Sequence, residues 1–139
     1  MNRDQFDNLS PLDYRYMDES VAKHLSENGF TACNLLVELA LARVLNRRKI
    51  CPDTALHEIE AACAKVTTEE VYAEEKRIKH DMRALVNCIC KRVSEQAKPY
   101  VHMTATSFDI RDTASALRYT ERPGGYLRIN KLTKMHKRD

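Results

Sequence analysis

The sequence is poor in the residues that interrupt helices. Only three glycines and four prolines occur among its 139 residues. Because glycine and proline are the main breakers of helical structure, their scarcity favours helices over a turn-rich fold. No stretch of useful length alternates apolar and polar residues, as a half-buried strand would. We therefore predict an all-α fold of about five or six helices, followed by an irregular tail.

Long apolar runs are missing as well. The longest, Leu35–Ala42, is interrupted by Glu38 and is far too short to span a bilayer. We therefore expect no membrane partner. Apolar residues make up 43% of the chain and charged residues 31%, which is typical of a globular domain rather than a disordered segment.

The motifs of most cofactor sites are also absent. No cysteine or histidine spacing suits zinc, and the chain has no glycine-rich phosphate loop and no nucleophile motif. The five cysteines are odd in number, and four of them fall within helical patterns (Cys33, Cys63, Cys88 and Cys90). We expect these four to be reduced core residues. Reduced thiols and the lack of a secretory leader favour the cytoplasm.

An excess of one charge is confined to the end of the chain. The overall net charge of +3 is too weak to indicate nucleic-acid binding by the whole domain. Residues 121–139 carry a net charge of +4, whereas residues 1–120 carry −1. The basic tail therefore leaves a second hypothesis open, that of a non-catalytic helical module whose tail binds an anionic partner.

Helical periodicity is the main signal that the sequence contains. We predict a first helix capped by Asp18 or Ser20 and stopped by Gly29, and then the strongest helix over residues 31–48. This second helix is apolar nearly all round. We expect it to lie inside a bundle or against another chain, and hence expect a homo-oligomer.

Four further helical patterns follow it. One short helix comes after the break at residues 51–54, and a charged one covers about residues 69–79, opened by Thr67 or Thr68 with Glu70. An amphipathic pattern covers residues 82–96, and the last helix runs from Asp109 to about Tyr119. We place the boundary between the helical domain and the tail after residue 119, because residues 121–125 break any helix.

The stretch from His102 to Thr113 is unusually rich in hydroxyl groups for the entry to a helix. Thr106 and Ser107 stand just before the predicted helix, where hydroxyl groups cap free backbone N–H groups. The same exposed N–H groups also favour anions. Local chemistry therefore leaves two interpretations open, an ordinary cap or a cradle for a carboxylate or phosphate.

Two other short stretches could contribute to such a site. His80 lies between Lys79 and Asp81 at the junction of two helical patterns, a position that suits an acid, a base or a phosphate ligand. The alternative interpretation is that Asp81 simply caps the next helix. Near the start, Arg15 and Tyr16 offer a planar cation and a phenol that could hold a phosphate or pack on the surface.

Taken together, residues 10–16, 75–81 and 102–113 resemble the first domain of adenylosuccinate lyase, in the fumarase/aspartase superfamily. The order and spacing of the three motifs match over about residues 8–119. Tyr14 stands where the family usually has glycine, and Lys79 where it usually has arginine. Lysine keeps the positive charge but loses the bidentate geometry of arginine.

The resemblance implies a function and a set of site residues. The family cleaves succinyl-AMP, and a related succinyl ribotide of purine biosynthesis, to fumarate by β-elimination without metal or organic cofactor. Carried over by position, Arg15 and Tyr16 would bind the nucleotide. Lys79, His80 and Asp81 would hold its phosphate and ribose side, with His80 assisting catalysis. The hydroxyl groups of Thr106 and Ser107 would bind the succinyl or fumarate carboxylate.

The resemblance covers only part of a family member. The central helical bundle and C-terminal domain of the family, which supply a second catalytic histidine and the base, have no counterpart here. We therefore expect residues 1–119 to form a lyase-like N-terminal domain that is inactive alone, and residues 120–139 to be a basic tail unlike the family. The expected ligands are the nucleotides succinyl-AMP and AMP together with fumarate, and nucleic acid is not an expected partner.

Overall fold

The computed structural model describes residues 4–10, 13–16 and 18–120, and these residues contain helices and turns but no strand. The all-α prediction is therefore confirmed. Five helices have ten or more residues; these are α3 (Glu27–Arg47), α4 (Asp53–Cys63), α5 (Thr68–Ile78), α6 (Asp81–Cys90) and α7 (Ser107–Thr120). Shorter segments are η1 (Gln5–Asp7), α1 (Asp13–Tyr16), α2 (Glu19–Leu25) and η2 (Lys98–Tyr100).

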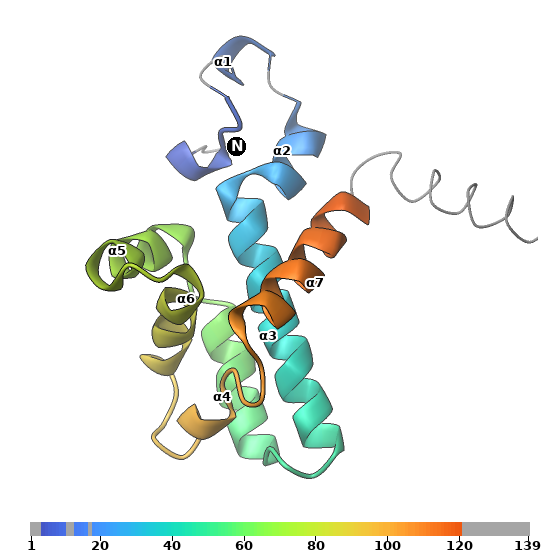
Figure 1. Cartoon of the computed structure of the whole chain (residues 1–139), viewed down its shortest axis with the longest axis vertical. Helices are drawn as coiled ribbons and strands as arrows, with labels where there is room; N and C mark the ends of the chain where they lie inside the picture. The colour runs from blue at the N-terminus through green and yellow to red at the C-terminus, as the bar shows by residue number, and fades with distance from the viewer. Residues whose placement is uncertain (1–3, 11–12, 17, 121–139) are drawn as a thin grey trace, which may run out of the picture.

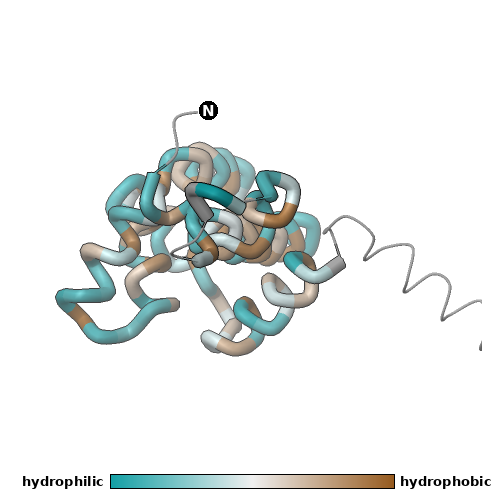
Figure 2. Tube along the Cα trace, turned by 90° about the horizontal axis from the view of Figure 1, so that it is seen from above, coloured by the Kyte–Doolittle hydropathy of each residue, from teal (hydrophilic) through white to brown (hydrophobic). Residues whose placement is uncertain are grey.

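Helix α3 is the element around which the others pack. It contacts α2, α4, α5 and α7, while α5 and α6 form an antiparallel pair at its side (Figure 1). Seen from above, hydrophilic residues colour much of the outer rim of the bundle (Figure 2). The largest fully buried side chains of the described core include Ile59 of α4 and Ile89 of α6. The prediction that the strongest apolar helix lies inside a bundle is thus confirmed for one face of α3.

By length and composition alone, α3 is the one described helix that could cross a membrane. Half of its most apolar stretch is buried against the rest of the chain, as is common in the central helix of a packed core. Its buried face also carries the polar residues Asn34 and Glu38, which a lipid-facing helix would avoid. The length of α3 alone therefore does not indicate a membrane span.

The junction between α2 and α3 differs from the prediction. Asp18 does cap α2, because its carboxylate accepts the Ser20 backbone N–H at 2.9 Å. Gly29, however, does not end a helix; it lies inside α3, which starts at Glu27 behind a cap from the Ser26 hydroxyl. A β-carbon at Gly29 would lie 2.6 Å from the Lys23 carbonyl oxygen. The glycine is therefore required for close packing between the two helices rather than for a turn.

Helix α6 is shorter than its amphipathic pattern predicts. The pattern extends to residue 96, but the helix ends at Cys90 and turns follow. Glu58 of α4 accepts hydrogen bonds from the Ser94 backbone N–H at 2.6 Å and from the Ser94 hydroxyl at 3.1 Å. Ala97 is then fully buried in a small cluster with Leu45 and Cys51. These tertiary contacts hold residues 94–97 in a conformation that a longer α6 would not allow.

All five cysteines are free thiols. Cys51, Cys63 and Cys88 are buried, whereas Cys33 and Cys90 are half-buried. Burial raises the pKa of the Cys63 thiol to about 12, so that thiol stays protonated and unreactive at neutral pH. Cys33 and Cys90 are the two thiols that solvent can reach in the described structure, although burial also raises the pKa of Cys90.

Candidate functional site

The hydroxyl-rich segment leads directly into α7, which begins at Ser107. Both the backbone N–H and the hydroxyl of Thr106 donate to one carboxylate oxygen of Asp109, each at 2.8 Å. These donors lower the pKa of Asp109, so the carboxylate is firmly ionised. Asp109 thus already supplies the negative charge beside Thr106. Ser107 is half-buried, and its hydroxyl has no hydrogen-bond partner among the described residues.

A buried pair of side chains, Glu38 and His102, anchors the hydroxyl-rich segment to α3. Nδ1 of His102 lies 2.5 Å from Oε1 of Glu38, whose side chain is only 1% exposed. Burial raises the pKa of Glu38, while the facing His102 opposes that rise. The other carboxylate oxygen of Glu38 is buried without a partner. Sequence analysis missed this pair, although Glu38 inside an apolar run was a signal that a buried charge needed a partner.

The same segment has an unusual backbone. His102 and Thr104 have φ angles of 58° and 66°, in the left-handed region that non-glycine residues rarely adopt. Such conformations cost of order 1–3 kcal/mol each and persist only where surrounding contacts impose them. The Glu38–His102 contact is one such constraint, and it determines how the chain approaches the start of α7.

The second motif forms the junction between α5 and α6. Lys79 ends α5 with a φ of 59°, and His80 is the N-cap residue of α6. Nδ1 of His80 accepts the Arg83 backbone N–H at 3.2 Å, so the proton of a neutral ring lies on Nε2. The cap of α6 is therefore His80, and not Asp81 as the alternative interpretation of the sequence had it. The His80 side chain remains 54% exposed and available to a ligand.

An ion pair joins the second and third motifs. Asp81 at the start of α6 lies 2.8 Å from a guanidinium nitrogen of Arg111 in α7. The Arg111 guanidinium also lies 5.6 Å from the centre of the Phe108 ring. Asp81 and Arg111 stand in the wall of a cavity of about 420 Å³ that α3 and α5 also line. Sequence analysis did not single out Arg111, because nothing local distinguishes it from any surface arginine.

The first motif lies apart from the other two. Arg15 and Tyr16 belong to the short helix α1, which sits beyond α2 at one end of the long axis of the molecule, away from the starts of α6 and α7 (Figure 1). Both side chains are exposed, that of Tyr16 by 76%. The described fold thus brings together Asp81 and the α7 entry, but does not bring Arg15 or Tyr16 to them.

Within the described residues, no group of three or more histidine, cysteine, aspartate or glutamate side chains could hold a metal ion. The region offers groups for hydrogen bonding and charge. It consists of an exposed imidazole, a free serine hydroxyl at the start of a helix, and a lysine at the end of another.

The curated proteins that this chain resembles include several adenylosuccinate lyases. No family model matches the chain. Adenylosuccinate lyase from Methanocaldococcus jannaschii is 35% identical over 111 residues, and that from Pyrococcus horikoshii is 40% identical over 111 residues. Each alignment covers 78% of this chain and 24% of the relative. The chain therefore spans about a quarter of the length of the curated relatives it matches.

A solved structure gives the same indication. The fumarate lyase from Mesorhizobium sp. BNC1 superposes with a TM-score of 0.63 at 29% sequence identity. The match covers 73% of this chain and 24% of that one. An alignment over 78% of a 139-residue chain necessarily spans residues 79–81 and 106–107, so these positions lie within the region of similarity.

Proposed function

The chain belongs to the fumarase/aspartase superfamily as a relative of the N-terminal region of adenylosuccinate lyases, and on that premise we propose that it carries part of a succinyl-nucleotide site. The proposed reaction of the complete enzyme is β-elimination of fumarate from succinyl-AMP and from the related succinyl ribotide of purine biosynthesis. It proceeds by acid–base chemistry, without a cofactor, and we expect it in the cytoplasm.

The observation that carries the proposal is the arrangement at the starts of α6 and α7. The Asp81–Arg111 ion pair links the start of α6 to the second turn of α7, with His80 exposed beside Asp81 and the free hydroxyl of Ser107 one turn before Arg111. A helix start with a free hydroxyl favours the binding of a carboxylate such as that of fumarate. An exposed imidazole next to Lys79 suits the phosphate and ribose side of a nucleotide.

The geometry also refines the roles proposed for the individual residues. Because Thr106 already donates to Asp109, its hydroxyl must give up that bond before it can bind a substrate carboxylate. Ser107 is therefore the better donor of the two in this structure. Arg15 and Tyr16, on α1, would reach the nucleotide only if the start of the chain is placed differently in a complete enzyme.

A single partial site cannot complete the reaction. β-Elimination needs a base for the proton beside the carboxylate and an acid for the leaving nitrogen, and His80 could serve only as an assistant to either. We propose that the main acid and base come from segments outside this chain. The pure chain should then release no measurable fumarate from succinyl-AMP, and fumarate release that is abolished by His80→Ala would overturn this view.

The binding half of the proposal can be tested directly. Titration of the chain with AMP or fumarate should shift the NMR signals of residues 79–81 and 104–109, with a dissociation constant of about a millimolar or weaker, because few contacts are available. His80→Ala should weaken AMP binding, whereas His57→Ala, at an exposed histidine of α4, should not. An absence of shifts at tens of millimolar ligand would rule out a preserved half-site.

The homo-oligomer expected from the sequence is also part of this proposal. The outer face of α3 leaves Leu36 47% exposed and Val44 36% exposed, each about one turn from the exposed Ala40 that lies between them. An exposed apolar stripe of this kind favours association with another helix. Sedimentation of the pure chain should show dimers or larger species, and a monomer at high concentration would contradict the proposal.

The second candidate function rests on the net charge of +4 in residues 121–139, which lie outside the described residues. A basic segment of this kind could bind an anionic partner without any catalysis. Comparison of RNA and DNA binding by the chain with and without these residues distinguishes the two functions. Binding that depends on the tail and falls steeply with salt would favour the helical module.

A further inference from the structure

A concave, positively charged surface lies on the face shared by α5, α6 and the segment at residues 98–101. It is a cleft of about 580 Å³. Four cationic side chains line it, and Glu74 is the one carboxylate in its wall. The cations are Arg77, Arg83, Lys91 and Lys98. The net charge of the lining residues is therefore +3.

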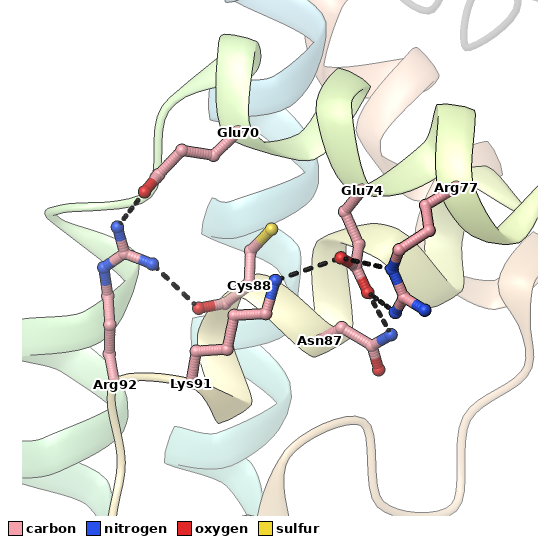
Figure 3. A network of polar contacts seen from close by, with 7 residues as sticks. All are labelled: Glu70, Glu74, Arg77, Asn87, Cys88, Lys91 and Arg92. Atoms are coloured by element: carbon pink, nitrogen blue, oxygen red, sulfur yellow. Dashed lines mark hydrogen bonds and ion pairs between the residues drawn. The ribbon is translucent and has the colours of Figure 1, made fainter.

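Two of the four cations are fixed by the buried Glu74. Its carboxylate, 7% exposed, accepts from Arg77 at 2.6 Å, from Lys91 at 3.0 Å and from the Asn87 side-chain amide at 2.8 Å. Figure 3 shows these three donors converging on Glu74 from α5 and α6. The cations are thus positioned before any ligand arrives, which lowers the entropy lost on binding.

The fixed cations keep donors for a ligand. The side chains of Arg77 and Lys91 are still 68% and 58% exposed, and each has N–H groups beyond those that Glu74 accepts. Within the described residues, the Arg83 guanidinium has no hydrogen bond or ion pair of its own. Lys98 is paired with Glu95, whose side chain is 82% exposed and outside the cleft wall. A polyanion therefore meets several unsatisfied N–H donors.

Apolar residues complete the lining of this open cleft. Val86, Pro99 and Val101 supply apolar wall, and Val86 and Val101 are buried in the core. Concave walls of low polarity strengthen the field of the surrounding cations because they exclude water. We propose that this cleft binds a small phosphate-bearing polyanion, held by the guanidinium groups of Arg77 and Arg83 and the ammonium groups of Lys91 and Lys98.

This site is distinct from the proposed succinyl-nucleotide site. None of the seven residues assigned to that site lines the cleft. Failure of AMP or fumarate to bind at residues 79–81 and 104–109 would leave the inference about the cleft unaffected, and the reverse also holds.

Cys90 provides a local reporter for the test. Its thiol is half-buried in the cleft wall, and Cys33 is the other half-buried thiol, in α3 outside that wall. The full chain is treated with iodoacetamide at constant ionic strength, with increasing inorganic pyrophosphate, and alkylation at each cysteine is followed by mass spectrometry. Pyrophosphate should slow alkylation of Cys90 saturably, with half-protection at about a millimolar, and leave Cys33 unchanged.

Two charge-matched variants decide whether the cleft is responsible. Arg83→Gln should raise the half-protecting concentration about tenfold, since it removes a guanidinium with no other partner. Lys23→Gln removes the same charge from an exposed position of α2 and should leave the concentration within about twofold of the parent value. The Arg83 side chain makes no hydrogen bond or ion pair with the other described residues, and circular dichroism verifies that both variants remain folded.

Several outcomes would overturn the inference. One is that pyrophosphate leaves Cys90 alkylation unchanged. Another is that the two variants weaken protection equally, which would indicate a general charge effect. Protection by a single-stranded oligonucleotide but not by pyrophosphate would instead assign the surface to nucleic acid. Saturable protection that Arg83→Gln alone weakens supports a polyphosphate site.

Discussion

Two buried carboxylates in this chain have opposite surroundings. Glu74 of α5 is 7% exposed and accepts from Arg77, Asn87 and Lys91. Glu38 of α3 is 2% exposed and, among the described residues, pairs only with His102, with one oxygen left without a partner. Both residues lie in helices, so helical geometry does not account for the difference. What differs is the number of donors that the neighbouring elements bring.

The two pKa values follow from the donors. Three donors lower the pKa of Glu74 from its ordinary 4.5 to about 2, led by the hydrogen bond from Arg77. Burial raises the pKa of Glu38 above its ordinary 4.5, although His102 works against that rise. A charge that is fully paired stabilises the fold, whereas a half-paired one in the interior costs free energy.

The comparison also has a functional side. The half-paired carboxylate lies under the segment with two left-handed residues that leads to the candidate succinyl-nucleotide site. Strained backbone and incompletely satisfied polar groups often gather at functional sites. The fully paired carboxylate, by contrast, positions cations of the cleft between α5 and α6. The segment that contains His102 and Thr104 has a strained backbone, whereas the cleft between α5 and α6 has cations that Glu74 already positions.

The largest expected effect comes from breaking the half-paired region. His102→Ala leaves Glu38 as a buried charge without compensation and should lower the free energy of unfolding by about 3 kcal/mol at pH 7. Urea unfolding measures this loss. His57→Ala, at an exposed histidine, should change stability by less than about 0.5 kcal/mol. Equal effects of the two variants would mean that the Glu38–His102 contact contributes nothing.

A smaller loss should follow from breaking the fully paired region with Glu74→Gln. Because the pKa of Glu74 is lower in the folded chain, its contribution is present above pH 4.5 and is lost as the pH falls towards about 2. The variant should therefore be less stable than the parent at pH 7, and the difference should shrink in acid. Glu95→Gln, at a side chain 82% exposed, is the matched control and should show little of either effect.

The opposite pH dependence is expected for Glu38→Gln. Because the pKa of Glu38 is raised on folding, its favourable contribution is present below pH 4.5 and is lost as the pH rises through the raised value. The variant should therefore lose less stability than the parent between acid and neutral pH. Parallel pH profiles for the Glu38 and Glu74 variants would remove the contrast between the two regions.

A double replacement sharpens the comparison. Glu38→Leu combined with His102→Leu removes both members of the pair, so neither is left in the interior without its partner. Its stability should lie within about 1 kcal/mol of the parent, because apolar pairs commonly replace buried ion pairs at little cost. The coupling between the single variants, measured by a double-mutant cycle, should be about 2 kcal/mol. Additive losses would show that the two side chains are independent.

The smallest effect concerns the strained backbone itself. Thr104 has a φ of 66°, which glycine adopts without steric cost, so Thr104→Gly should raise stability by about 0.5 kcal/mol. Thr54→Gly, at an exposed threonine inside α4, should lower it by about the same amount. Thermal unfolding compares the two, and a loss in both would mean that Thr104 makes contacts worth more than its strain.

Local chemistry accounts for the parts of the fold that the sequence predicted well. Thr67 and Glu70, which are three residues apart in the chain, form the reciprocal cap of α5. Thr106 and Asp109 make a similar contact at the start of α7. Such pairs can be read from spacing alone, because a helix start brings residues i and i+3 together whatever surrounds it.

Long-range pairs account for what sequence analysis missed. Glu38 and His102 are 64 residues apart, and Glu58 and Ser94 are 36 residues apart. No local pattern links such residues, so the end of α6 and the anchoring of the α7 entry were not predicted. Gly29 was read as a helix stop for the same reason, since only the packing of α2 against α3 shows why a side chain is excluded there.

The sequence by itself determined the helical class, the capped helix starts and the three motifs that resemble the lyase family, because scarcity of glycine and proline, cap spacing and motif order are all properties of neighbouring residues. Only the tertiary structure decided which charges are paired, where α6 ends and which motifs meet through Asp81 and Arg111. The physical reason is that the free energy of a buried charge depends on donors brought from distant parts of the chain.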